Sequence, residues 1–327
     1  MDTWVAWGIL ALAVGASHWG AGRFAEPLQK LKRQLGFSAA AGASVVALAT
    51  ASPEISTNAA SALQSVSNIG LGNLLGANII SVPVIVTVAY LATRRGEGRR
   101  HAAHHLLPLD DQANRVQAVP YLGVVALVAI LTLPAPWRGL QPIDGWIMLG
   151  AYAAYVAHAL LRARTPGESV AWTRREVMRA SAGVAALVAG AYYTVQATET
   201  LVSAYGISQI VGGLFITAGM SIVLEVFATW SLAKRGLLTA ATTSVIADNL
   251  ATMTLAFFPL ALATTPIDDL RLYSFNLGFV GLYAAVYVLF VRYRTDRKGF
   301  ERREVVALNL LYGLYLGLML GWVLDGI

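Results

Sequence analysis

The sequence predicts an all-α polytopic membrane protein with ten transmembrane helices, arranged as two inverted five-helix repeats. Three observations lead to this prediction: the composition, the spacing of the apolar stretches and the placement of the basic residues. Of the 327 residues, 57% are hydrophobic and only 13% are charged, and the mean hydropathy is +0.60. An ordinary soluble domain has roughly 25% charged residues, so the composition excludes a soluble globular protein.

The apolar stretches have the length that a membrane requires. A helix needs about 20 residues to cross roughly 30 Å of hydrocarbon, and ten stretches of suitable length occur along the chain. A transmembrane β-barrel would show alternating segments of about 10 residues instead. The predicted spans are 4–20, 37–63, 69–92, 116–133, 144–161, 180–203, 208–232, 239–263, 272–291 and 305–324.

The basic residues fix the expected orientation. If the N-terminus faces away from the cytoplasm, every odd-numbered loop lies inside, and only Arg138 and Arg271 of the 24 Lys and Arg residues fall outside. Cytoplasmic loops of membrane proteins are enriched in Lys and Arg. We therefore expect a multi-pass protein of the cell inner (plasma) membrane with both the N- and C-termini outside.

An internal repeat divides the chain. When the sequence is aligned so that Glu54 meets Glu225, other polar positions coincide as well. The repeat begins at the second span and again at the seventh, and an odd number of spans per repeat inverts the second copy. The matched pairs are Thr50 with Ser221, Asn58 with Thr229, Asn73 with Ser244, Asn78 with Asn249, and Ser81 with Thr252.

The predicted organisation follows from this alignment. Residues 1–161 form the first five-helix repeat and residues 180–327 form the second. Residues 162–179 are the cytoplasmic connecting loop between them.

Polar residues recur at i, i+4 and i+8 inside four of the apolar spans, which places each set on one helical face. Facing lipid would be costly, so the four faces should meet inside the protein. Helix-to-helix hydrogen bonds explain a lone Ser or Thr, but they do not explain three intramembrane acids. The sets are Thr50/Glu54/Asn58, Asn73/Ala77/Ser81, Ser221/Glu225/Thr229 and Ser244/Asp248/Thr252.

The three acids point to cation binding. No Lys, Arg or His lies near the centre of any predicted span, and three converging carboxylates cannot all be ionised in an empty site of low dielectric constant. They must hold protons or metal cations, and oxygen ligands suit Ca²⁺ and, by the same logic, Na⁺. Pro53 has no N–H, so we expect the carbonyl of Ala49 to be free to turn toward a cation.

These residues resemble a known family. Ala49–Glu54 (ATASPE) followed by Gly72–Ile79 (GNLLGANI) resembles the first α-repeat of the cation/Ca²⁺ antiporter superfamily, in particular sodium/calcium exchangers. The second segment, Gly219–Glu225 (GMSIVLE) with Ala247–Leu250 (ADNL), resembles a degenerate second copy. The two α-repeat motifs cover about 36–82 and 206–253.

The resemblance implies roles for individual residues. Glu54 and Glu225 match the two acids that ligate Ca²⁺ and share in Na⁺ binding. Thr50 and Ser221 match residues that offer carbonyl and hydroxyl oxygens one turn earlier.

The sequence also departs from the family pattern. Ala77 and Asp248 stand where the family usually has Ser, and Ser81 and Thr252 stand where it has Asn or Asp. Hydroxyl oxygens expected at sodium sites are therefore missing, which leaves Na⁺ and H⁺ open as the driving ion.

The expected function is secondary active cation antiport, with Ca²⁺ or a related divalent cation exchanged for Na⁺ by alternating access; H⁺-coupled exchange is the alternative. A channel would not need enclosed carboxylates, and an intramembrane enzyme would need a nucleophile–base pair or a histidine metal site at depth. The candidate ion ligands are Glu54, Glu225, Asp248, Thr50, Ser221, Ala49, Ser81, Thr252, Asn73, Ser244, Asn78 and Asn249.

The expected partners are inorganic cations and the lipid bilayer. We expect no enzyme activity, no cofactor and no nucleic-acid partner, and no protein partner can be inferred. The chain has no cysteine, which excludes disulfides and thiolate metal sites. His101, His104 and His105, with Asp110 and Asp111 downstream, have a spacing that could bind a transition metal, but a cytoplasmic loop with incidental histidines is favoured.

Overall fold

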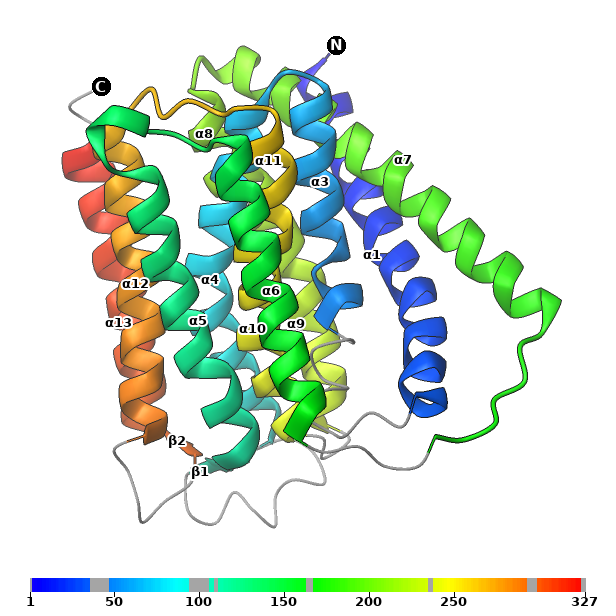
Figure 1. Ribbon diagram of the computed structural model, residues 1–327. Coiled ribbons are helices and arrows are strands. Elements are labelled where there is room, and N and C mark those ends of the chain that lie inside the picture. The colour runs from blue at the N-terminus through cyan, green and yellow to red at the C-terminus, as the bar shows by residue number, and fades with distance from the viewer. Residues whose placement is uncertain are drawn as a thin grey trace.

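The computed structural model describes residues 2–35, 47–93, 106–108, 111–162, 167–234, 238–292 and 299–324, and it is almost entirely helical (Figure 1). The helices of the first half are α1 (Thr3–Gln34), α3 (Ser52–Leu63), α4 (Ser67–Thr93), α5 (Asp111–Thr132), the 3₁₀-helix η3 (Ala135–Trp137) and α6 (Pro142–Arg162). Those of the second half are α7 (Arg174–Tyr205), α8 (Gln209–Gly212), α9 (Ala218–Lys234), α10 (Leu238–Ala251), α11 (Phe257–Leu262), α12 (Leu270–Arg292) and α13 (Arg302–Leu318).

Two kinds of element were not expected from the sequence. Three π-helical segments interrupt the second half, and a short antiparallel sheet joins two loop segments. The π-helical segments are η4 (Gly213–Thr217), η5 (Thr252–Ala256) and η6 (Met319–Leu324). The strands are β1 (Leu106–Pro108) and β2 (Gly299–Glu301).

The helices agree with the apolar pattern of the sequence. Every predicted span overlaps a helix or a run of helical segments, and six helical stretches of the described chain are long and apolar enough to cross a membrane. The second span is broken: residues 47–50 are helical, a turn falls at Ala51, and α3 follows. The predicted connecting loop is shorter than expected because α7 begins at Arg174, after the capping box formed by Thr173 and Glu176.

The outer surface has the character of a surface in contact with lipid. Large apolar side chains are exposed on many helices, among them Leu12 (77%), Phe227 (67%) and Leu310 (69%). Large apolar side chains exposed on this many helices are typical of a surface that contacts lipid. The chain is therefore an all-α, multi-pass membrane protein.

Helix α4 forms the centre of the bundle. It is apolar on all sides and buried along almost its whole length, which is typical of a helix surrounded by other helices. It packs against α3, α9, η4, α10, α12 and α13. The elements that carry the predicted site are thus arranged around one central helix.

Two glycine positions set the distance between α4 and η4. A Cβ atom at Gly72 would overlap the carbonyl oxygen of Ile210, and one at Gly213 would overlap the carbonyl oxygen of Ile69. Small residues of this kind let helix backbones approach closely in membranes. The first and second halves of the chain are therefore in backbone contact at this crossing.

Helices α1 and α7 form a second unit beside the bundle (Figure 1). They pack against each other along much of their length, and Gly20, Gly183 and Gly190 lie at the contact. Each has far fewer contacts with the other helices. The two halves of the chain are therefore joined by a helix pair as well as by the central crossing.

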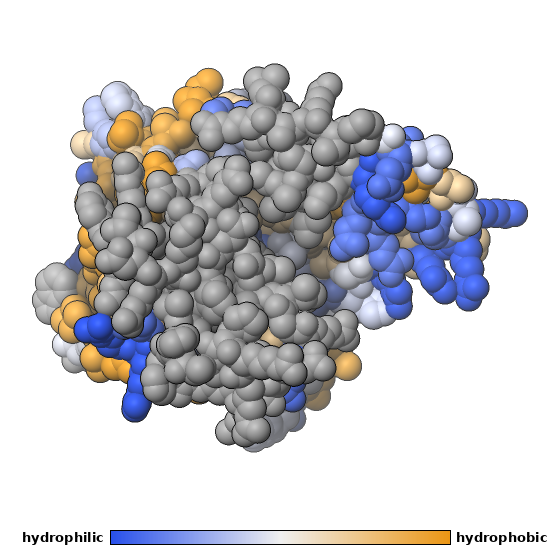
Figure 2. All heavy atoms as spheres, turned by 90° about the horizontal axis from the view of Figure 1, so that it is seen from below, coloured by the Kyte–Doolittle hydropathy of each residue, from blue (hydrophilic) through white to orange (hydrophobic). Residues whose placement is uncertain are grey.

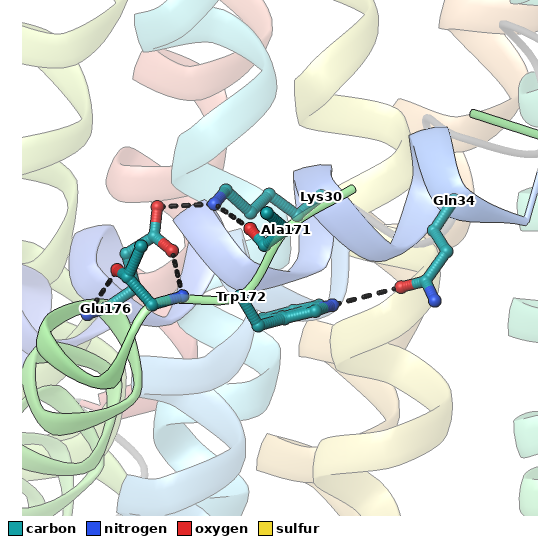
Figure 3. A network of polar contacts seen from close by, with 6 residues as sticks. Lys30, Gln34, Ala171, Trp172 and Glu176 are labelled. Carbon is teal, nitrogen blue, oxygen red and sulfur yellow. Dashed lines mark hydrogen bonds and ion pairs between the residues drawn. The ribbon is translucent and has the colours of Figure 1, made fainter. Parts of the chain in front are cut away.

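The segment between α6 and α7 is attached to the end of α1 (Figure 3). Lys30 forms an ion pair with Glu176 and donates a hydrogen bond to the carbonyl of Ala171 at 3.0 Å. Trp172 donates to Gln34 at 3.1 Å. Hydrogen bonding by Lys30 and by the backbone of Thr173 lowers the pKa of Glu176 to about 2, so Glu176 is ionised at physiological pH.

Seen from this end of the molecule, hydrophilic side chains gather beside the region drawn in grey (Figure 2). They lie on the side where Figure 1 places the start of α7 and the end of α1. The predicted histidine site at residues 101–105 with Asp110 lies outside the described residues, as does the side chain of Asp111.

We expect Gly213→Ala to destabilise the protein because the added methyl group collides with the backbone of α4. Overpacking of this kind costs about 1–3 kcal/mol, so the melting temperature of the detergent-purified protein should fall by several degrees. Gly219→Ala is the matched control, since a Cβ there meets no atom within 4 Å. Equal melting temperatures for the two variants would contradict the close crossing.

Candidate functional site

Three acidic side chains from both halves of the chain approach one another inside the bundle. Glu54 lies in the first turn of α3, Glu225 in α9 and Asp248 in α10. When ionised, Asp248 repels the carboxylates of both Glu54 and Glu225, and Glu54 also repels Glu225. None of the ion pairs in the described part of the chain involves these acids. The fold therefore concentrates negative charge without a basic partner.

Several oxygen atoms at these positions have no hydrogen-bond partner. Among the described residues, both carboxylate oxygens of Glu54, Oδ1 of Asp248, Oδ1 of Asn73 and Oγ1 of Thr252 are buried and unpaired. Buried polar atoms in native proteins are nearly always hydrogen bonded, because an unpaired one costs free energy. A group of unpaired acceptors around carboxylates is the environment that a cation would satisfy.

A cavity of about 260 Å³ adjoins two of the acids. Its lining includes Glu225 and Asp248, together with Thr50, Thr229 and, from α1, His18. Sequence reasoning did not place an imidazole near the acids. The Nδ1 atom of His18 lies 3.0 Å from the carbonyl oxygen of Val14 in its own helix.

The backbone before Glu54 differs from the expectation. Pro53 is the second residue of α3, and its missing N–H does leave the Ala49 carbonyl without its helical donor. However, the hydroxyl of Ser52 donates to that carbonyl at 2.7 Å. The Ala49 oxygen is therefore already hydrogen bonded once, and only its second lone pair remains for a cation.

Two predicted ligands on α4 are held by other side chains. The amide nitrogen of Asn78 donates to the carbonyl of Leu74 at 2.8 Å, and its oxygen accepts from the hydroxyl of Tyr121 at 2.9 Å. Ser81 donates to Oδ1 of Asn249 at 2.9 Å. These bonds connect α4 with α5 and α10, so Asn78, Ser81 and Asn249 contribute to the structure around the acids.

The remaining predicted residues are distributed as follows. Ser221 is buried on α9 one turn before Glu225, and Thr252 is buried at the start of η5. Ser244 lies in α10, but its side chain lies outside the described part of the chain. Among the described residues, no three His, Cys, Asp or Glu side chains lie close enough together to hold a metal ion by themselves. A bound cation would therefore need neutral oxygens in addition to the carboxylates.

Tyr121 is a residue of the site that sequence reasoning missed. It is fully buried in α5, within the predicted span 116–133. A tyrosine in the middle of an apolar span needs a hydrogen-bond partner for its hydroxyl, and that requirement was the available signal. Its partner, Asn78, lies in a different helix and could not have been identified from the sequence.

An all-α, multi-pass membrane fold that brings three acids together inside the bundle fits the class of membrane transporters. The family model described as sodium/calcium exchanger protein matches residues 5–161 and 180–321. The chain therefore belongs to the sodium/calcium exchanger protein family, which is a family of transporters.

Solved structures of exchangers share the fold at low sequence identity. The sodium-calcium exchanger NCX_Mj, soaked with 2.5 mM Na⁺ and 10 mM Sr²⁺, is 19% identical, with a TM-score of 0.65 over 97% of this chain and 99% of that chain. The H⁺/Ca²⁺ exchanger CAX is 17% identical, with a TM-score of 0.69 over 97% of this chain and 82% of that chain. No curated protein matches the sequence.

Removing the hydroxyl of Tyr121 should destabilise the protein. In Tyr121→Phe the oxygen of Asn78 loses its donor, and a lost buried hydrogen bond costs about 1 kcal/mol. The melting temperature of the purified protein should therefore fall by a few degrees. Tyr192→Phe, at a half-exposed position, should leave it unchanged; no decrease for Tyr121→Phe would contradict the assigned hydrogen bond.

Proposed function

We propose that the protein is a secondary active cation antiporter that exchanges Ca²⁺, or a related divalent cation, for Na⁺ by alternating access. The observation that carries this proposal is the set of buried, unpaired oxygens on Glu54, Asp248, Asn73 and Thr252. Carboxylate, carboxamide and hydroxyl oxygens are the ligands that Ca²⁺ prefers in proteins. The ligand set proposed from the sequence, headed by Glu54, Glu225 and Asp248, belongs to this proposal.

The proposed topology has ten spans in two inverted repeats, with residues 1–161 and 180–327 on either side of the connecting segment. An even number of spans places both termini on one side, and Figure 1 shows the start of α1 and the end of α13 at the same end of the bundle. The two symmetric acids also follow comparable irregularities: Glu54 follows the turn at Ala51, and Glu225 follows η4. The basic loops favour an orientation with both termini outside, and the proposed location is the plasma membrane.

The charge of the site favours exchange over one-way flow. Three carboxylates that form no ion pair among the described residues are too costly to leave ionised in a low-dielectric interior. The site can therefore change its exposure only while it holds cations or protons. Each outward passage of one ion then requires an inward passage of another, which is the definition of antiport.

The counter-ion is proposed to be Na⁺, with H⁺ as the alternative. One observation favours H⁺: Ala77 is buried on α4 at a position without a side-chain oxygen, while Asp248 supplies an extra carboxylate. A carboxylate can take a proton on a single oxygen, whereas Na⁺ needs several oxygen ligands.

The deciding experiment measures ⁴⁵Ca²⁺ uptake into proteoliposomes that contain the purified full-length protein. An outward Na⁺ gradient should drive uptake if Na⁺ is the counter-ion, and an outward H⁺ gradient should do so in the alternative. Uptake that needs neither gradient would indicate a channel and overturn the proposal.

Replacing either symmetric acid should abolish exchange. Glu54→Gln and Glu225→Gln keep the size of the side chain but remove an anionic ligand, so gradient-driven ⁴⁵Ca²⁺ uptake should fall to the level of empty liposomes. Glu26→Gln is the matched control, because Glu26 is exposed and pairs with Arg23 on α1. Normal uptake by Glu225→Gln would mean that the second repeat is misaligned.

We further expect Asp248 to couple the two ions. Asp248→Asn should preserve some Ca²⁺ binding but weaken the dependence of flux on the driving gradient, because the group that alternates between Ca²⁺ and the counter-ion loses its charge. The double variant Asp248→Ser with Thr252→Asp should recover exchange with a steeper Na⁺ dependence. The measurement is Ca²⁺ flux against Na⁺ concentration and pH, and identical curves for all three proteins would exclude the coupling role.

A further inference from the structure

Asn58 connects the ion site to a distant part of the chain. It lies on α3 one turn after Glu54 and is fully buried. Its amide nitrogen donates to the backbone carbonyl of Ala256 at 3.1 Å, and its oxygen accepts from the amide nitrogen of Asn73 at 3.2 Å. Ala256 is the last residue of η5, where π-helical bonding ends.

The chemistry of these bonds fixes which way each carboxamide points. The Ala256 carbonyl can only accept, so the group of Asn58 that faces it must be the NH₂ group. The oxygen of Asn58 then lies on the other side, and the group of Asn73 that meets it must also be NH₂. Asn73 therefore directs its own oxygen away from Asn58, and this is the oxygen that has no partner in the described structure.

One turn beyond Asn73, helix α4 has no side-chain oxygen that could act as a ligand. Ala77, one turn further along α4, is buried and has no side-chain oxygen. A carboxamide oxygen is a suitable neutral ligand for Ca²⁺. A carboxamide turned the other way would present its NH₂ group, whose partial positive charge would repel a cation.

We propose that Asn58 is a positioning residue that holds Asn73 with its oxygen toward the cation bound by Glu54. This inference rests on the proposed cation-binding function. The bond to the Ala256 carbonyl determines the orientation of Asn58, and Asn58 determines that of Asn73. The η5 segment of the second half thus determines the orientation of a proposed ligand, Asn73, in the first half.

The test is a double-mutant cycle on the apparent KM for Ca²⁺ in proteoliposome uptake. Asn73→Leu and Asn58→Leu remove the carboxamides at similar side-chain volume. Each should raise KM about tenfold, the effect of losing one ligand interaction of about 1.4 kcal/mol, with little change in the maximal rate. Because Asn58 acts only through Asn73, the double variant should have the same KM as Asn73→Leu.

A second readout separates positioning from simple support of the fold. The rise in melting temperature on adding Ca²⁺ to the purified protein should shrink equally in both single variants. Asn276→Leu is the matched control: Asn276 is also fully buried and bonded at both ends, to Leu272 and Tyr315, so its loss should lower the melting temperature but not change KM. If Asn58→Leu does not fold, Asn58→Ala serves with the same expected rise in KM.

Three results would overturn the inference. KM effects that multiply in the double variant would show that Asn58 and Asn73 act independently. An unchanged KM for Asn58→Leu or Asn58→Ala, with a lowered melting temperature, would show a purely structural role. Absence of any Ca²⁺ response in the unmutated protein would overturn the proposed function and this inference together, whereas the first two results leave the proposed function intact.

Discussion

The structure depends on one electrostatic constraint: three carboxylates lie close together inside the bundle, and none of them forms an ion pair in the described part of the chain. Burying an unpaired charge costs several kcal/mol even after relaxation of the surroundings. The helices α3, α9 and α10 bring Glu54, Glu225 and Asp248 together, and protons or cations bound at the proposed site would remove this cost. The proposed ion binding would therefore stabilise the fold, and the same constraint makes the proposed exchange obligatory.

Close backbone packing and interhelical hydrogen bonds hold together the helices that carry the acids. The glycine contacts between α4 and η4 bring the two halves of the chain together at the level of the site. Hydrogen bonds of Asn58, Asn78 and Ser81 then cross between helices. Such bonds are modest individually in membranes, but here they also determine which atoms remain free to bind an ion.

The sequence predicted the features that depend on local pattern. Apolar spans, the three acids and their arrangement on helical faces follow from composition and from the i, i+4 spacing, and the helices confirm the all-α membrane fold. The sequence could not predict contacts that depend on how one helix is rotated against another. The bond of Asn58 to Ala256 and the position of His18 in the cavity are of this kind. The bond from Ser52 to Ala49 is local, and Ser52, three residues after Ala49, was the available signal.

The departures from the exchanger pattern affect the two possible counter-ions in opposite ways: they remove oxygen ligands for Na⁺ and add a group that can bind H⁺. Ala77 lacks a hydroxyl oxygen that a sodium site would use, while Asp248 adds an acid that can take a proton. One divalent ion among three ionised carboxylates leaves one negative charge, which either counter-ion could neutralise at Asp248. Sodium coupling additionally requires replacement oxygens, and the free oxygen of Asn73 is one that the structure supplies. The orientation of a single carboxamide therefore bears on which ion drives transport.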